Sequence, residues 1–222
     1  AQTLTELVAM RDGTRLATDV YLPTATPPFP VLVYRTPYDK EGTRETAITI
    51  TAAANLALVV QDTRGRFASE GVDCVFRCEL GDGLGDGADT LSWIDAQPWS
   101  NGTVVTDGGS ALGIVQYMQG PTNPRGLAAM HVLVATPSMY DHAYFQGGVL
   151  RQAMMEGWLE GQGSSFFLDD VRAAVATGLD FPDEVEAPKI REIKAEFPVI
   201  AVFVYGTATE ALMRAEAERH ER

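Results

Sequence analysis

The chain has 222 residues, of which 45% are hydrophobic and 21% charged, a composition that suits one compact globular domain with a full hydrophobic core. Its 30 acidic residues outnumber the 17 basic ones, and the net charge of -13 argues against nucleic acids and anionic membranes as partners, because both need a positive field. The longest apolar runs are far shorter than the ~20 residues of a membrane-spanning helix, so no span is predicted.

The first part of the sequence alternates strand and helix patterns. Residues 3–10 and 15–22 have strand periodicity on either side of an Asp-Gly pair, which predicts a β-hairpin. Residues 31–36 and 56–62 are continuous apolar runs, separated by a helical pattern over residues 44–55. Such runs are typical of parallel strands that are covered on both faces.

The alternation continues as far as residue 136. A helical pattern over residues 86–99 precedes a strand pattern over residues 102–107. A second helix is expected from the turn at Ser110 to Met118, and a buried strand over residues 127–136. The sequence therefore predicts an α/β architecture, with a mostly parallel sheet and helices on both faces.

The pattern changes after residue 136. No strand is expected between residues 137 and about 180, where two amphipathic helical patterns are rich in Met, Trp and Phe. We therefore expect residues 137–190 to form a helical cap over the core begun by residues 1–136. A last strand and a terminal helix within residues 191–222 should complete that core.

Ser110, in "VVTDGGSALG", is the main candidate for a catalytic residue. A strand, a glycine-flanked serine and a helix make a nucleophile elbow, which exposes the serine Oγ and aims the N–H groups of the helix at a developing oxyanion. The glycine that usually stands two positions after the serine is displaced by one, to Gly113. From these residues alone, a serine that caps a helix after a tight turn stays open as the alternative.

Five segments support the first interpretation. In order along residues 8–165, they read "VAMRDGTRLATDVYLP", "VLVYRTPYDK", "DTRGRFASEG", "DGADTLSWIDAQPWSNGTVVTDGGSALGIVQ" and "YFQGGVLRQ". Together they resemble the cocaine esterase and X-Pro dipeptidyl-peptidase type of α/β hydrolases. The resemblance implies an α/β-hydrolase fold and a serine hydrolase that cleaves small-molecule esters or amides through an acyl-enzyme at Ser110.

The resemblance also implies an oxyanion hole. The family pattern G-x-S-Y-x-G accounts for Gly113, whereas Ala111 stands where the family has tyrosine. Ala111 keeps the backbone N–H that the oxyanion hole uses. The tyrosine of "RTPYDK" donates its hydroxyl to the oxyanion in this family, and that position is Tyr38.

A serine nucleophile needs a base and a group that orients the base. The chain has three histidines. His131 lies within an apolar strand and is expected to be a packed, hydrogen-bonded core residue, and His220 is expected in a solvated tail. His142 follows the C-terminal end of a buried strand and is the remaining candidate for the base.

By the same resemblance, the acid should follow a strand that ends in G-x-x-D. Here Gly206 is followed by Thr209 at the acid position, and Glu210 is one residue further on. The family's histidine and its jelly-roll domain would come later still, so both are expected to be absent. Three explanations stay open: a truncated or fused derivative of a longer hydrolase, a minimal enzyme that uses His142, and a noncatalytic ligand- or partner-binding remnant. Truncation would expose sheet edges, so self-association is expected.

Charged residues near the site have two interpretations. Asp62, Arg64 and Arg66 in "DTRGRFASEG" either bind a substrate carboxylate or form an ion-pair network that fixes the loop, and the network is favoured. A second acidic group lacks the spacing of a calcium loop and is expected in a solvated turn and helix cap. It consists of Asp82, Asp86 and Asp89.

Cys74 and Cys78 could approach each other, but structural or free thiols are favoured over a local disulfide, and no metal site is predicted. No cofactor is predicted either. The first ten residues lack a basic segment followed by an apolar one, so no signal peptide is expected, and the compartment stays open between the cytoplasm and secretion after signal removal.

Overall fold

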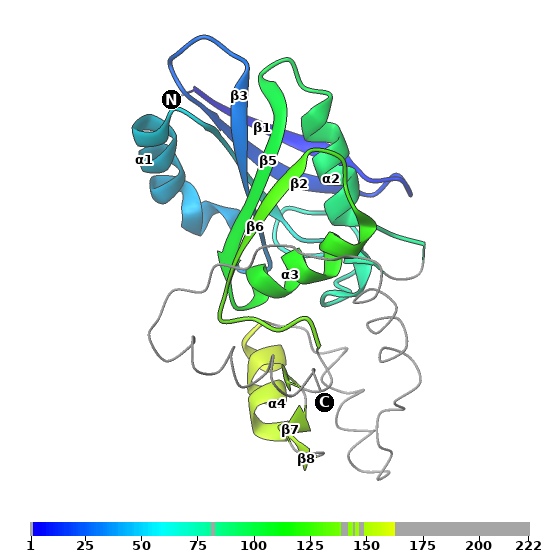
Figure 1. The fold of residues 1–222 in the computed structure, drawn as a ribbon. Helices are drawn as coiled ribbons and strands as arrows, with labels where there is room; N and C mark the ends of the chain where they lie inside the picture. Colours follow the sequence, from blue (N-terminus) through cyan, green and yellow to red (C-terminus); the bar gives the residue numbers. More distant parts are fainter. Residues whose placement is uncertain (1, 81–82, 139–141, 144, 147–148, 163–222) are drawn as a thin grey trace, which may run out of the picture.

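The computed structural model describes residues 2–80, 83–138, 142–143, 145–146 and 149–162 (Figure 1). Its main sheet has six strands in the order β1-β2-β4-β3-β5-β6. The four strands from β4 to β6 run parallel, and β1 and β2 add an antiparallel pair at one edge. The strands are β1 (Gln2–Ala9), β2 (Arg15–Leu22), β3 (Phe29–Thr36), β4 (Ala57–Asp62), β5 (Ser100–Gly109) and β6 (Leu127–Leu133). The predicted α/β architecture with a mostly parallel sheet is confirmed.

Helices cover both faces of this sheet. One face carries α1 (Arg44–Ala54), and the other carries α2 (Asp86–Asp95) and α3 (Ala111–Gln119) (Figure 1). The helix α4 (Gln152–Gly161) lies beyond the end of the sheet where β5 leads into α3 (Figure 1). Short 3-10 turns connect these elements, namely η1 (Lys40–Thr43), η2 (Arg77–Glu79) and η3 (Gly120–Thr122).

The central strands contribute to two hydrophobic cores. On one side of β4, Val59 packs in a cluster with Leu91 and Ile94 of α2. On the other side, Leu58 packs in a cluster with Ala47 of α1. All six residues of β4 are buried, which is why its first four residues, Ala57 to Val60, are apolar without alternation, and its last two, Gln61 and Asp62, are buried polar residues.

The predicted hairpin is present as β1 and β2. Its turn contains Gly13, whose φ of 85° favours glycine because that residue has no Cβ. The Met10 N–H donates to the Thr14 carbonyl at 2.8 Å and closes the turn. The pairing then runs from Ala9 with Arg15 to the far end of the two strands.

The cap region contains a short strand pair that the sequence analysis did not expect. β7 (Phe145–Gln146) pairs antiparallel with β8 (Val149–Leu150), so the prediction of no strand between residues 137 and about 180 was wrong here. Gly147 and Gly148 separate the two strands in the sequence, and glycine is a poor helix former, so the helix begins only at Gln152.

Other predicted elements fall on residues 163–222, which lie outside the described part of the chain. These are the second cap helix, the last strand and the terminal helix. The division into residues 1–136, 137–190 and 191–222 therefore stays a prediction. Among the described residues, no helix is both long and apolar enough to cross a membrane.

Candidate active site

Ser110 occupies the turn between β5 and α3 in a strained conformation. Its φ of 55° and ψ of -124° lie outside the regions that L-residues favour, at a cost of roughly 1–3 kcal/mol. The Ser110 N–H donates to the Leu133 carbonyl at 2.9 Å, and the Ser110 carbonyl accepts from the N–H groups of Gly113 and Ile114. The residue is exposed. The turn from β5 into α3 therefore has the sharp strand-to-helix geometry that a nucleophile elbow requires.

Two glycines make this turn possible. A Cβ on Gly108 would lie 2.4 Å from the Cβ of Leu112, and the φ of Gly108 is 140°. A Cβ on Gly113 would lie 2.6 Å from the Cβ of Ala135 and 2.9 Å from Cγ1 of Val132. The displaced glycine therefore lets α3 pack closely on the segment that contains β6, which explains its position three residues after Ser110.

Ala111 is buried at the first position of α3. The first N–H groups of a helix have no carbonyl partner inside the helix, and the helix dipole adds positive potential there. Both effects favour a negative charge beside Ser110. The backbone N–H of Ala111 is thus placed at the helix end that the sequence analysis assigned to the oxyanion hole.

Tyr38 follows β3, the neighbour of β5 in the sheet. Because the two strands are parallel, Tyr38 and Ser110 come after strand ends at the same edge, where open α/β sheets bind ligands. The Tyr38 N–H donates to the Oγ1 of Thr36 at 2.9 Å. The Tyr38 hydroxyl accepts a hydrogen bond from Nε1 of Trp158 on α4, at 3.2 Å.

His142 lies exposed after β6. Its N–H donates to the Ser138 carbonyl at 3.3 Å, and its own carbonyl accepts from Nη1 of Arg151. Within the described part of the chain, no hydrogen bond joins the imidazole of His142 to Ser110. His220, Thr209 and Glu210 lie outside the described residues. The base and the acid therefore stay predictions.

His131 is hydrogen-bonded as expected, but it does not lie in the core. Its Nδ1 is 2.7 Å from Oδ1 of Asp107, and 36% of its side chain is exposed. The hydroxyl of Tyr34 donates to Oδ2 of the same carboxylate at 2.5 Å. Burial, and then the hydrogen bond to Asp107, raise the pKa of Tyr34. The strand pattern predicted a buried position, whereas β6 is at the edge of the described sheet.

The comparison with known proteins identifies the family. Residues 12–197 match the sequence profile of the X-Pro dipeptidyl-peptidase (S15) family. The chain belongs to this family. The match extends beyond the five sequence segments quoted above, and it includes most of the described fold.

Similar proteins are known from both sequence and structure. A cocaine esterase from Rhodococcus sp. (strain MB1 Bresler) is 40% identical over 158 residues, which are 68% of this chain and 27% of the esterase. The structure of an α-amino acid ester hydrolase matches with a TM-score of 0.61 at 27% identity. The matched region covers 73% of this chain and 30% of the hydrolase chain.

The structure of an aminopeptidase from a Thaumarchaeota archaeon of marine sediment matches with a TM-score of 0.58 at 28% identity. The matched region covers 72% of this chain and 30% of the aminopeptidase chain. The S15 chain described here thus spans less than a third of the length of each of these three relatives.

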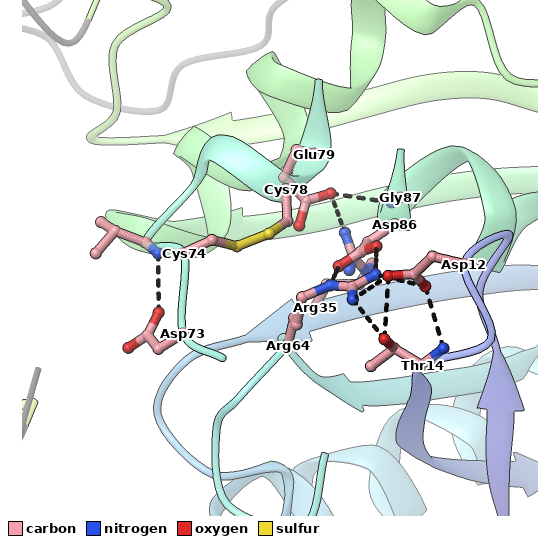
Figure 2. The surroundings of a disulfide bond; sticks show 11 residues. Asp12, Thr14, Arg35, Arg64, Asp73, Cys74, Cys78, Glu79, Asp86 and Gly87 are labelled. Atoms are coloured by element: carbon pink, nitrogen blue, oxygen red, sulfur yellow. Dashed lines mark hydrogen bonds and ion pairs between the residues drawn. A yellow bond between two sulfur atoms is a disulfide. The ribbon is translucent and has the colours of Figure 1, made fainter. Parts of the chain in front are cut away.

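In this S15 chain, Arg64 joins the loop after β4 to the turn between β1 and β2 and to the start of α2 (Figure 2). Its Nε and Nη2 donate to the carboxylate of Asp86 at 2.9 and 2.7 Å, and its Nη1 donates to Asp12 at 2.7 Å. The ion-pair interpretation is therefore confirmed for Arg64. The expectation of a solvated Asp86 was wrong, because 1% of this residue is exposed. Asp89, three residues later, is paired with Arg11.

The side chains of Asp62 and Arg66 also form hydrogen bonds with backbone groups of other segments. The Oδ1 of Asp62 accepts from the Lys40 N–H at 2.8 Å, and burial raises the pKa of Asp62. Arg66 donates to the Pro37 carbonyl at 3.2 Å and to the Gln162 carbonyl at the end of α4. The loop after β4 thus fixes both the segment before Tyr38 and the end of the cap helix.

A buried ion pair near the same loop was not found from the sequence. Arg35 of β3 donates to Glu79, whose carboxylate also accepts from the Gly87 N–H at 3.0 Å (Figure 2). Burial raises the pKa of the Glu79 carboxyl, and Arg35 opposes this effect. The two partners are 44 residues apart and show no shared motif, so no local pattern in the sequence indicates the pair.

Cys74 and Cys78 form a disulfide bond (Figure 2). The preference for free or structural thiols was therefore wrong. The chain between them bends back, with a positive φ at Val75 and the 3-10 turn η2 that begins at Arg77, and this brings the two Cα atoms to 5.9 Å. Among the described residues, no cluster of His, Cys, Asp and Glu could hold a metal ion.

Proposed function

We propose that this chain carries the nucleophile of a serine hydrolase, which cleaves esters or amides of small molecules through an acyl-enzyme at Ser110. The observation that supports this most strongly is the backbone of Ser110, which combines positive φ, exposure and a position directly before α3. A plain helix cap needs no positive φ, because N-cap residues normally have β-region dihedral angles.

The proposed chemistry follows from this position. The Oγ of Ser110 attacks the substrate carbonyl while the base takes its proton, and the tetrahedral intermediate collapses to the acyl-enzyme when that proton passes to the departing alcohol or amine. The Ala111 N–H and the Tyr38 hydroxyl stabilise the oxyanion, and the dipole of α3 adds to this effect. Water then hydrolyses the acyl-enzyme and regenerates Ser110.

The proposal also requires a base that takes the proton of Ser110. His142 is the candidate that the described residues offer, and Glu210 is the candidate acid outside them. We further propose that the cap segment of residues 145–178, of which 163–178 lie outside the described residues, covers the substrate. The support is α4, which lies beyond the end of the sheet where β5 leads into α3 (Figure 1), and Ser110 stands exposed between those two elements. Self-association of the chain also remains a proposal.

The names of the relatives suggest the class of substrate. One relative is called a cocaine esterase, another an α-amino acid ester hydrolase and a third an aminopeptidase. Their common element is an acyl group bound to an alcohol or amine. We therefore propose a small acyl compound as the substrate and keep esters and amides as alternatives.

A second candidate function is noncatalytic binding of such compounds. It is favoured by one observation: within the described part of the chain, the Ser110 hydroxyl has no hydrogen bond to a histidine. A nucleophilic serine normally has a base within hydrogen-bond reach, although the distance is often longer in the absence of substrate.

Hydrolysis of a p-nitrophenyl ester distinguishes the two functions. Wild type should release p-nitrophenol well above the rate in buffer, and Ser110→Ala should lose this activity. Ser92→Ala is the matched control, because Ser92 is an exposed serine on α2 that bonds only within its helix. Equal rates of hydrolysis in wild type and Ser110→Ala would contradict the proposed catalysis by Ser110. Binding of the ester without turnover would then support the second function.

A further inference from the structure

Trp158 and Tyr38 are in contact although 120 residues separate them in the sequence. The indole Nε1–H of Trp158 lies 3.2 Å from the hydroxyl oxygen of Tyr38. An indole can only donate, so the Tyr38 hydroxyl must be the acceptor in this bond. The hydrogen of that hydroxyl is consequently directed elsewhere. A hydroxyl that accepts one hydrogen bond also becomes a better donor in the next.

The indole is held in place by its surroundings. Trp158 packs against the cluster of Met155 and Leu159 on α4, and Val75 packs against the same cluster. Its ring centroid is 5.7 Å from that of Phe76, with an angle of 31° between the planes. Val75 and Phe76 stand between Cys74 and Cys78, and so belong to the short loop that this disulfide closes.

A second connection fixes α4 relative to Tyr38. Arg66 donates both to the carbonyl of Gln162, directly after α4, and to the carbonyl of Pro37, directly before Tyr38. The helix is therefore bound to the segment that carries Tyr38 at two points. One point is the backbone of Pro37, and the other is the hydroxyl itself.

We propose that Trp158 is a positioning residue that acts through Tyr38. Its N–H fixes the direction of the Tyr38 hydroxyl, so that the phenolic hydrogen is donated to the oxyanion that forms at Ser110. This inference rests on the proposed function and deepens it. The cap helix α4 then belongs to the catalytic arrangement, because the N–H of its Trp158 fixes the direction in which the Tyr38 hydroxyl donates to the oxyanion.

The kinetic test uses Trp158→Phe, which keeps an aromatic ring beside Phe76 but removes the N–H. We expect kcat for ester hydrolysis to fall roughly five- to tenfold, as for loss of one hydrogen bond, while KM changes less than twofold. Tyr38→Phe removes the donor itself and should lower kcat about 100-fold. Trp93→Phe is the control, because Trp93 lies on α2 and packs against Trp99.

The double variant separates positioning from a structural role. If Trp158 acts through Tyr38, the variant with both changes should have the same kcat as Tyr38→Phe within about twofold. A further five- to tenfold loss in the double variant would show that Trp158 acts independently of Tyr38, and would overturn the inference. An unchanged kcat in Trp158→Phe would overturn it as well.

An NMR measurement tests the hydrogen bond without any need for activity. The indole N–H resonance of Trp158 is the one of three that Trp158→Phe removes. In Tyr38→Phe it should move upfield and exchange faster with solvent, and no change would contradict the bond. If wild type shows no Ser110-dependent hydrolysis, the proposed function fails together with this inference. If wild type is active and Trp158→Phe equals it, only the inference fails.

Discussion

Asp107 accepts a hydrogen bond from Nδ1 of His131 at 2.7 Å, across the neighbouring strands β5 and β6 and three residues before Ser110. The same carboxylate accepts from Tyr34 of β3. This network joins three adjacent parallel strands. It orients a histidine, but in a strand and not in the loop where the sequence analysis sought the base.

Loss of the Asp107 carboxylate should destabilise the fold. Asp107→Asn weakens its hydrogen bonds to both Tyr34 and His131, and we expect the free energy of unfolding to fall by roughly 1–3 kcal/mol in urea denaturation. Asp95→Asn is the control, because Asp95 pairs with Arg125, whose side chain is 86% exposed. That change should cost less than about 1 kcal/mol. Equal effects of the two variants would contradict a stabilising network.

The ion pair between Arg64 and Asp12 should make stability depend on acid pH. The hydrogen bond from Arg64 lowers the pKa of Asp12 to about 2. Since this pKa is below the unfolded value of about 3.9, the stabilisation is fully present above that value and is lost as the pH falls towards 2. Because Asp12 is partly exposed, we expect only about 1 kcal/mol. Unfolding of wild type and Asp12→Asn should differ at pH 6 and converge near pH 2, and a constant difference would contradict the assignment.

Gly113 should not tolerate a side chain. Gly113→Ala places a Cβ 2.6 Å from that of Ala135, and we expect a loss of about 1–3 kcal/mol in unfolding free energy from overpacking. Gly157→Ala on α4 is the matched control, because its Cβ would meet nothing within 4 Å. This change should stabilise the helix by roughly 0.5–1 kcal/mol. A tolerated Gly113→Ala, measured by thermal and urea unfolding, would show that the approach of α3 to β6 is not tight.

The Cys74–Cys78 disulfide should contribute modestly to stability. It closes a very short loop, and the chain-entropy relation gives about 2 kcal/mol for a ring of this size. The variant with serine at both positions should lose that amount relative to the oxidised wild type. The difference should disappear when wild type is reduced with dithiothreitol. A variant as stable as the oxidised protein would show that the loop is held by its other contacts alone.

Local patterns predicted much of the fold. β3 and β4 were recognisable from their short runs of apolar, largely β-branched residues, and the turn at Ser110 because only glycine fits at Gly108 and Gly113. The second cap helix and the last strand stay untested, since they lie outside the described residues.

Long-range contacts could not be predicted in the same way. The bonds from Trp158 to Tyr38 and from Arg35 to Glu79 join residues 120 and 44 positions apart. Such pairs depend on how elements meet in space, and a periodic pattern describes only one element at a time. The disulfide was missed for a related reason: a spacing of four residues is compatible with both paired and free cysteines.

Covalent labelling with a fluorophosphonate tests the central claim most directly, because this reagent requires an activated serine but no matching acyl group. Peptide mass spectrometry should locate one label per chain on Ser110 in wild type. Ser110→Ala should remain unlabelled, and Ser92→Ala should be labelled like wild type. No label on Ser110, or equal labelling of Ser110→Ala, would contradict the assignment of Ser110 as the nucleophile.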